Sequence, residues 1–373
     1  MVAKKIVFFA KRRFFIEKTV CKYGKICYNK VMKNTNANKN KTKNGKNTSK
    51  QTEQGAFKAL LDKPTRENSS GFAFSFAAMC MFGLNFVALL VLSWSGVDFE
   101  RLKETPPDWY LYLCYVLPPI ALFFVAIWYF NRTKKSVAET LKKQKCHFKY
   151  YLLALALQVG LLSLSFSNTL FAEFLQSLGY TLPKNNIPSL DGFGIVGAIF
   201  VIAVLPAVFE EIIFRGVVLD GAYAYGTAGA ALLCGGLFAL YHQNPEQTIY
   251  QFCWGAAFAL MAIRAGCIFP TMLAHFINNA TILILQKCLP ENKELNLPLP
   301  VFIPVIIISA LCLIGTLFYL IFVDKNRLQD EGAGDSAEAK KTKRSVFILG
   351  AMIGVLICFV NWASALYTGF TVS

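Results

Sequence analysis

The sequence predicts an all-α membrane protein, a polytopic bundle of about eight or nine transmembrane helices. Of its 373 residues, 55% are apolar and 14% are aromatic, and the mean hydropathy is +0.44. Spanning a bilayer takes about 20 mostly apolar residues in a helix. The runs that meet this requirement are 72–97, 109–130, 150–167, 192–219, 227–243, 246–263, 268–288, 299–323 and 346–368.

The first 70 residues are expected to form a basic, largely disordered cytoplasmic tail. They hold 18 Lys and Arg against 4 Asp and Glu, whereas the rest of the chain holds 20 against 18. The net charge of +16 is therefore concentrated in this tail. We expect such a tail to contact anionic lipid, and we expect no nucleic-acid partner. Residues 34–54 are rich in Asn, Lys and Thr, which is typical of disorder. Translation from Met32 is a further hypothesis.

Residues 71–190 are expected to hold the N-terminal transmembrane helices. The segment 131–149 carries seven basic residues against Glu139 alone. Because basic loops stay in the cytoplasm, this segment, the turn near Arg264 and the polar loop 324–345 are placed there, with the N-terminus. The segments expected on the other side of the membrane are acid-leaning or nearly neutral: 98–108, 168–191 and 289–298.

Residues 191–290 hold the polar side chains that are hardest to explain in a membrane. The chain has 3 His, and two of them lie in apolar runs, as does the pair Glu210-Glu211. A charged side chain at mid-bilayer costs about 2.5–3.5 kcal/mol on insertion scales, so such residues are functional candidates. The 11 Cys are scattered without a C-x-x-C pair, which favours packing over a disulfide framework or a zinc-thiolate site.

The first motif is an acidic pair one turn before an arginine. Glu211 and Arg215 are four residues apart with the acid first, the favoured order for an ion pair on a helix. Glu210 points about 100° away, so it stays free for another partner. A charge pair that only joins helices is the alternative, but it leaves the second Glu unexplained.

The second and third motifs place a polar residue on a helix face. Phe238 and His242 are four residues apart, and so are His275 and Asn279. Two side-chain donors one turn apart can hold a developing oxyanion, and Asn278 competes with Asn279 for this role. A satisfied core histidine and an interhelical hydrogen bond are the alternatives for His242 and His275.

The three motifs are expected to reach similar depths. Glu210 lies about ten residues, or roughly 15 Å, from the cytoplasmic end of its run, and His275 roughly 10 Å. His242 lies deeper, at roughly 22 Å, which helix tilt can absorb. We therefore expect one cavity that opens toward the cytoplasm.

In this order and spacing the motifs resemble those of the CPBP family, also called Abi, which includes type II CAAX prenyl endopeptidases and bacteriocin-processing and immunity proteins. The residues that carry the resemblance are Glu210-Glu211-x-x-x-Arg215, Phe238-x-x-x-His242 and His275-x-x-x-Asn279. The similar region covers about 192–290. The resemblance implies an intramembrane endopeptidase with a CPBP-type core.

By this resemblance, Glu210 and His242 would activate the attacking water. His275 and Asn279 would form the oxyanion hole, while Glu211, Arg215 and Phe238 would support the site. Members of the family have been described both as metalloproteases and as glutamate proteases. A metal-free mechanism is favoured because the chain lacks an H-E-x-x-H motif. Zinc held by Glu210, His242 and His275 is the alternative.

Residues 291–373 are expected to form C-terminal transmembrane helices around the polar loop 324–345. The resemblance suggests a multi-pass protein of a bacterial plasma membrane. Its substrate would be a peptide or membrane protein that enters from the bilayer or the cytoplasmic side. Two other functions are kept open: a non-proteolytic immunity or regulatory scaffold, and a proton-coupled transporter.

Overall fold

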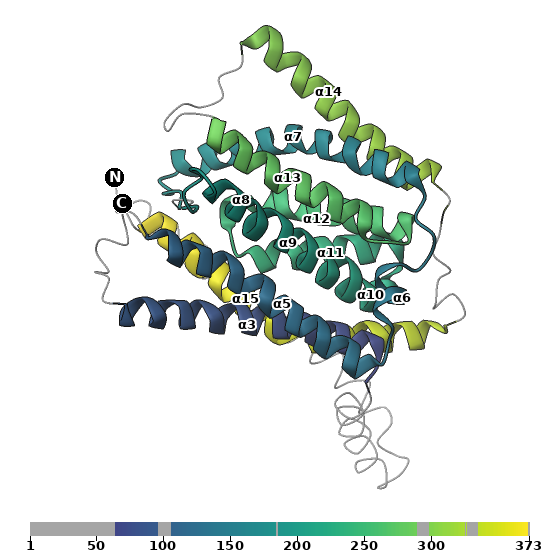
Figure 1. Cartoon of the computed structure of the whole chain (residues 1–373). Coiled ribbons are helices and arrows are strands. Elements are labelled where there is room, and N and C mark those ends of the chain that lie inside the picture. Colours follow the sequence, from purple (N-terminus) through teal and green to yellow (C-terminus); the bar gives the residue numbers. More distant parts are fainter. Residues whose placement is uncertain are drawn as a thin grey trace, which may run out of the picture. The chain divides into compact units, whose positions relative to one another are not determined.

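The computed structural model describes residues 64–95, 106–183, 186–288, 298–324, 326 and 335–371. The expected disorder of the tail and the Met32 hypothesis lie outside these residues. Within them the regular structure is helical, apart from one isolated bridge between Lys142 and Cys267. The chain is thus an all-α polytopic helical bundle, as the sequence predicts (Figure 1).

The described residues run back and forth between two ends of the bundle. The passes are α3 (Arg66–Trp94), α5 (Asp108–Thr133), α7 (Phe148–Ser177), a composite helix from Gly194 to Ala222, α11 (Gly226–His242), α12 (Thr248–Ala265), α13 (Phe269–Cys288), α14 (Leu299–Phe318) with η5 (Tyr319–Val323), and α15 (Ala337–Thr371). Shorter elements are α6 (Val137–Leu141), the 3-10 turn η3 (Tyr223–Tyr225) and the 3-10 turn η4 (Pro245–Gln247). The composite helix consists of α8 (Gly194–Ala198), η1 (Ile199–Val204), α9 (Leu205–Glu211), η2 (Ile212–Val218) and α10 (Leu219–Ala222).

One end of the bundle, here called the basic end, gathers the segments that the charge pattern placed in the cytoplasm. Asp220 is buried and binds Lys135 at 2.8 Å and Lys143 at 2.7 Å, which fastens the basic segment 131–149 to α10. Arg264 donates to the carbonyl of Leu320 at 2.7 Å. The amide of Lys143 donates to the carbonyl of Gly266 at 2.8 Å, so the end of α12 and η5 lie at the same end as the basic segment.

The other end, here called the opposite end, is held together by hydrogen bonds and one exposed ion pair. The backbone of Ser189 donates to Asp108 at 3.0 Å, and Lys287 binds Asp191 at 2.5 Å. The loop after α7 also meets the end of α15, where Thr181 donates to the carbonyl of Gly369 at 2.7 Å. This end therefore collects the described parts of the acid-leaning or neutral loops.

Within the described ranges, six helical segments are long and apolar enough to cross a membrane. The longest, Gly194–His242, folds back on itself at η3. Cys234 lies 3.1 Å from the carbonyl of Phe214, although 20 residues separate them, so the segment is a hairpin of two passes. α12 and α13 are not among the six. The number of eight or nine spans therefore stays a prediction.

The first described helix begins earlier than the apolar run that starts at residue 72. α3 starts at Arg66, because the side chain of Thr65 caps it by accepting from the amide of Asn68 at 3.2 Å. The turn is also buried by tertiary packing, with Ser69 and Ser70 fully covered. Capping and packing thus override the polarity that placed residues 66–70 in the tail.

α11 and α12, which carry part of the site, approach each other closely at two glycines. A Cβ on Gly235 would lie 2.7 Å from the backbone nitrogen of Ala256, and one on Gly255 would lie 3.0 Å from the Cα of Gly235. Small residues of this kind let helix backbones pack closely in membranes. The contact sets the distance between Phe238 on α11 and Trp254 on α12.

Candidate active site

The helix that carries Glu210 and Glu211 is interrupted on both sides. α9 is one short α-helical stretch between the π-helical stretches η1 and η2. Pro206 has no amide hydrogen, so it cannot donate to the carbonyl of Ile202 four residues earlier. The side chain of Asn279 on α13 donates to this carbonyl instead, at 2.9 Å. A proline in one helix thus creates the docking point for an asparagine on another.

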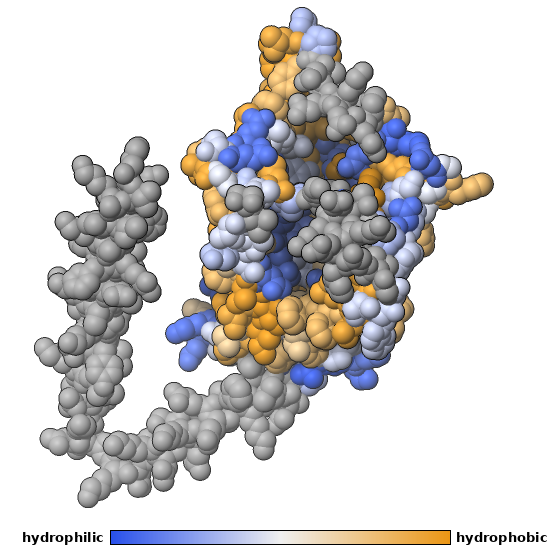
Figure 2. Space-filling view, turned by 90° about the vertical axis from the view of Figure 1, so that its left-hand side faces the viewer, coloured by the Kyte–Doolittle hydropathy of each residue, from blue (hydrophilic) through white to orange (hydrophobic). Residues whose placement is uncertain are grey.

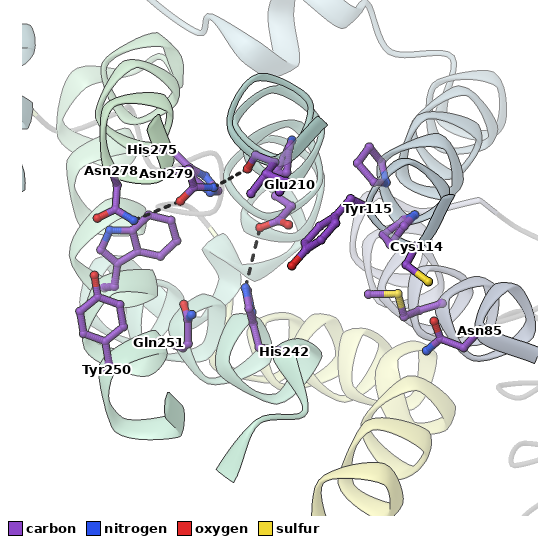
Figure 3. A pocket seen from close by; sticks show the side chains of 16 residues that line it. Asn85, Cys114, Tyr115, Glu210, His242, Tyr250, Gln251, His275, Asn278 and Asn279 are labelled. Atoms are coloured by element: carbon purple, nitrogen blue, oxygen red, sulfur yellow. Dashed lines mark hydrogen bonds and ion pairs between the residues drawn. The ribbon is translucent and has the colours of Figure 1, made fainter. Parts of the chain in front are cut away.

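Glu210 and His242 face each other across the junction of α9 and α11. Oε2 of Glu210 lies 4.0 Å from Nε2 of His242 (Figure 3). The other ring nitrogen of His242 lies 2.8 Å from the carbonyl of Phe238, which fixes Nδ1 as the protonated nitrogen. Nε2 of the neutral ring and an ionised carboxylate are then two acceptors without a hydrogen between them. This spacing suits a bridging water molecule better than a direct hydrogen bond.

The expected ion pair between Glu211 and Arg215 is present, with 2.9 Å between Oε1 and the guanidinium. Both side chains are completely buried. Three aromatic rings stack around the guanidinium, and their centroids lie 4.4 Å away for Phe238, 5.4 Å for Trp254 and 5.5 Å for Phe258. The rings stabilise the cation where water is excluded. Phe238 therefore contacts both His242 and Arg215.

His275, on α13, contacts Glu211 on another helix, α9. Its Nδ1 lies 3.1 Å from the same Glu211 oxygen that binds Arg215. The ring of Trp254 packs edge-on against it, with centroids 4.6 Å apart. The sequence paired His275 with Asn279 on one helix face, whereas in the structure Glu211 and Trp254 fix the orientation of the ring. Glu211 is thus shared between the first and third motifs.

The two neighbouring asparagines of α13 have different partners. Asn279 donates to Ile202, and Asn278 donates to the side-chain oxygen of Asn279 at 3.1 Å. Asn278 also accepts from Gln158 on α7, at 2.9 Å. One amide hydrogen of Asn279 remains for a ligand, since its side-chain nitrogen carries two. The hydrogen bond from Asn278 holds the side chain of Asn279 in its orientation, and both residues line the cavity described next.

The predicted polar residues Glu210, His242, His275 and Asn279 line one cavity of about 380 Å³ (Figure 3). Glu211 and Arg215 lie behind it, buried against α12 and α13. Helices α3 and α5, to which the sequence assigned no role, contribute Met81, Asn85, Tyr115 and Pro118-Pro119. The N-terminal helices therefore form one wall of the candidate active site.

The lining of the cavity reaches one end of the bundle. His242 is the last residue of α11, and Tyr250 lies in the first turn of α12, so this part of the lining belongs to the opposite end of the bundle. Seen from that end, the surface is hollowed and its interior is hydrophilic (Figure 2). The lining is therefore weighted toward the opposite end, because α11 and α12 are shorter than the helices around them. The depth argument expected a cavity open toward the cytoplasm, and which end of the bundle faces the cytoplasm stays a prediction.

The candidate zinc ligands do not form a metal site in this arrangement. Among the described residues, no three side chains of His, Cys, Asp or Glu are grouped closely enough to hold a metal ion. The contacts of His275 with Glu211 and of His242 with the carbonyl of Phe238 use Nδ1 and leave Nε2 of each ring available. The alternative set of Glu210, His242 and His275 is nevertheless not grouped as a metal site in this structure, and no step is derived through a metal.

The sequence reasoning missed Trp254, which contacts Arg215 and His275 at once. Its spacing to Phe258 is again four residues, and this was the available signal. α12 carries no acid or histidine, so no charged or metal-binding motif marked Trp254 as part of a site. Gln251, one turn before this pair, lines the cavity with Tyr250.

Comparison with known proteins bears on the same region. Residues 192–281 match the family model described as type II CAAX prenyl endopeptidase Rce1-like. All seven residues of the three motifs lie within the match. No curated protein and no solved structure matches the chain. The resemblance drawn from the motifs therefore agrees with the family model over the helices that carry the three motifs.

Proposed function

Because residues 192–281 carry an Rce1-like type II CAAX prenyl endopeptidase domain, we propose that the protein is an intramembrane endopeptidase that uses a water molecule activated by Glu210 and His242. The observation that carries the proposal is the 4.0 Å separation of Glu210 and His242 at the wall of a cavity. Among the described residues, Oε2 of Glu210 is buried without a hydrogen-bond partner. Such an oxygen is costly to leave unsatisfied, which favours a bound water or substrate there.

Hydrolysis would proceed by general base catalysis. The water donates one hydrogen to Glu210 and one to Nε2 of His242, which orients its lone pair toward the carbonyl carbon of the peptide bond. As the new C–O bond forms, Glu210 takes a proton from the water. The C–N bond then breaks, and Glu210 returns this proton to the leaving amine. The products are a new carboxyl terminus and a new amino terminus, and the carboxylate of Glu210 is regenerated.

The oxyanion that forms in this step needs donors. Asn279 has one amide hydrogen beyond the one that binds Ile202. His275 can donate from Nε2 when Nδ1 is also protonated and bound to Glu211. Such donors act strongly in a site that excludes water. We therefore assign Asn279 and His275 to the oxyanion hole, with Glu211 and Arg215 as positioning residues.

The substrate that suits this site is a peptide or a segment of a membrane protein. The cavity has about 380 Å³, and α3 and α5 give it a mixed wall in which Met81 and Pro118-Pro119 lie beside Asn85 and Tyr115, so it accepts a short unwound segment. A multi-pass protein in a bacterial plasma membrane, with anionic lipid at its basic tail, is the setting we propose. The proposed mechanism needs no metal, and chelator treatment of the purified protein would leave its activity unchanged. Loss of activity on chelation, restored by zinc, would favour the zinc alternative.

The proposal is tested by comparing the peptides of cells that produce the wild-type protein or Glu210→Gln. We expect cleavage products that depend on the wild type and disappear in the variant, while both proteins reach the membrane in equal amounts. Glu173→Gln is the matched control, because Glu173 is exposed on α7 and does not line the cavity. Identical peptide profiles for all three proteins would overturn the proposal and favour a scaffold.

A further inference from the structure

A second cavity adjoins the candidate active site at His242. It has about 630 Å³ and is formed by three segments of the opposite end: residues 180–183, the loop 243–246 and residues 361–369 of α15. His242 lines both cavities. The hydrophilic hollow of Figure 2 lies at this end of the bundle. Whatever occupies the second cavity is therefore next to the proposed catalytic water.

The second cavity has a mixed lining. Amide and hydroxyl side chains, among them Gln243, Asn361 and Thr368, alternate with apolar ones such as Leu182 and Pro183. Glu246 is the acid among its described lining residues, and no Lys or Arg is present there. Glu246 is 7% exposed, and its nearest partner is the hydroxyl of Tyr180 at 3.4 Å. Burial and the negative charge of Glu246 raise the pKa of Tyr180 to about 12, so this phenol remains a neutral donor.

The walls of the cavity are fixed by hydrogen bonds between distant segments. Asn361 donates to Gln243 at 3.1 Å, and Trp362 donates to Thr248 at 2.8 Å. Both bonds join α15 to the connection between α11 and α12. Because the walls are tied in this way, the cavity is formed before any ligand arrives, which lowers the entropic cost of binding.

The composition of the cavity selects its ligand. Amides and hydroxyls can donate to and accept from a peptide backbone, and the apolar part of the lining can pack against the side chains of the peptide. The buried carboxylate of Glu246, with one weak neutral partner, favours a cationic ligand. A charged hydrogen bond to that ligand replaces the hydrogen bonds to water that the carboxylate loses on burial. An extended peptide with a lysine or arginine side chain meets both requirements.

The location of the cavity indicates where this peptide comes from. The basic segments that bind Asp220 lie at the basic end, and the cavity lies at the opposite end. Basic loops stay in the cytoplasm. The cavity is then reached from the side of the membrane away from the cytoplasm, where a C-terminally prenylated cytoplasmic protein would not be presented.

We propose that this second cavity is a substrate subsite for a polar, extended stretch of peptide next to the bond that is cleaved, in which Glu246 binds one Lys or Arg side chain. The inference rests on the proposed function for the position of the cleaved bond. The subsite itself is a binding site, and its charge preference can be measured without hydrolysis.

The test uses the full chain in lipid nanodiscs with Glu210→Gln as the parent, so that bound peptide is not cleaved. The probe is a short fluorescent peptide of Ala, Ser and Gln with one central Lys, compared with matched peptides that carry Gln or Glu there. We expect the parent to bind the Lys peptide about tenfold more tightly than the Glu peptide. Adding Glu246→Gln removes this preference, and Glu246→Lys reverses it. Glu173→Gln leaves it unchanged.

A second variant covers the case in which the change at the buried Glu246 prevents folding. Ser364 lines the cavity and is exposed, so Ser364→Lys adds a positive charge without removing a contact of Glu246. It should weaken binding of the Lys peptide about tenfold. Tyr367→Lys is its control, since Tyr367 is 71% exposed on the same helix and does not line the cavity.

The outcomes distinguish a failure of the proposed subsite from a failure of the proposed endopeptidase activity. A charge preference that depends on Glu246 supports the subsite even where the wild-type protein cleaves none of the peptides. No preference in the parent, or a preference that persists in both Glu246→Gln and Ser364→Lys, overturns the subsite. Cleavage by the wild type would in that case still support the endopeptidase.

Discussion

Nδ1 of His275 lies 3.1 Å from Oε1 of Glu211, and so joins the first and third motifs across 64 residues of sequence. The same oxygen binds Arg215 at 2.9 Å, so a single carboxylate holds a histidine and an arginine. The orientation of the His275 ring therefore depends on α9 as well as on its own helix. Several changes at the site can be predicted from this arrangement.

Removing the charge of Glu211 should destabilise the protein. Glu211→Gln leaves Arg215 buried among Phe238, Trp254 and Phe258 without a counter-ion. Breaking a buried ion pair typically costs about 3–5 kcal/mol. Chemical unfolding in detergent should show a loss of this size. Asp191→Asn is the control, because its pair with Lys287 is exposed and should not change stability measurably. Equal stability of Glu211→Gln and the wild type would contradict this account of the pair.

Asn279 and Asn278 should differ in their effect on turnover. Asn279→Ala removes a donor of the proposed oxyanion hole and leaves the carbonyl of Ile202 unsatisfied. Removing one such donor typically lowers kcat about a hundredfold to a thousandfold. Asn278→Ala removes the hydrogen bond to Asn279 and the acceptor of Gln158, but no donor assigned to the oxyanion hole, and should lower kcat far less. Steady-state kinetics on a cleaved peptide distinguishes them, and equal losses would assign both residues to one structural network.

Two adjacent glycines on α11 offer a matched test of the helix packing. A Cβ on Gly235 would lie 2.7 Å from the backbone of α12, whereas a Cβ on Gly236 would meet no atom of a neighbouring helix within 4 Å. Gly235→Ala should force the helices apart and lower the midpoint of thermal unfolding. Gly236→Ala should be neutral or slightly stabilising, because alanine favours a helix by about 1 kcal/mol over glycine. A tolerated Gly235→Ala would contradict the close approach of α11 and α12.

The sidedness of the bundle can be read from cysteine labelling. Cys288 is exposed at the end of α13, in the opposite end of the bundle. A membrane-impermeant maleimide should label it in intact cells, with no signal at this site in Cys288→Ser. Ser136→Cys introduces a thiol in the exposed basic segment and should react only after permeabilisation. The reverse pattern would place the cavities on the cytoplasmic side.

The local parts of the site could be predicted from sequence because helices have a fixed period. Glu211 with Arg215 and Phe238 with His242 are each one turn apart, and both contacts are present. Polar residues from all three motifs, Glu210, His242, His275 and Asn279, also meet at one cavity, as their rarity in apolar helices suggested. These features depend on spacing along one helix and on the cost of burying charge.

The remaining features depend on contacts between helices, which spacing does not encode. The bond from Asn279 to Ile202 exists because Pro206 removes a backbone donor on another helix. The direction of the cavity depends on α11 and α12 ending short of their neighbours, which the hydropathy runs did not reveal. The aromatic rings around Arg215 include Trp254 and Phe258 of α12, a helix in which no acid or histidine marked the sequence.

The central claim is that Glu210 is the base that activates water. It is tested most directly by measuring kcat of the purified full chain and of Glu210→Gln on one peptide that the wild type cleaves, with equal folding of both proteins shown by thermal unfolding. Loss of a general base typically lowers the rate about a hundredfold to ten-thousandfold, and we predict a loss in this range for Glu210→Gln. Glu173→Gln should retain the wild-type rate. A Glu210→Gln protein that cleaves at the wild-type rate would contradict the account.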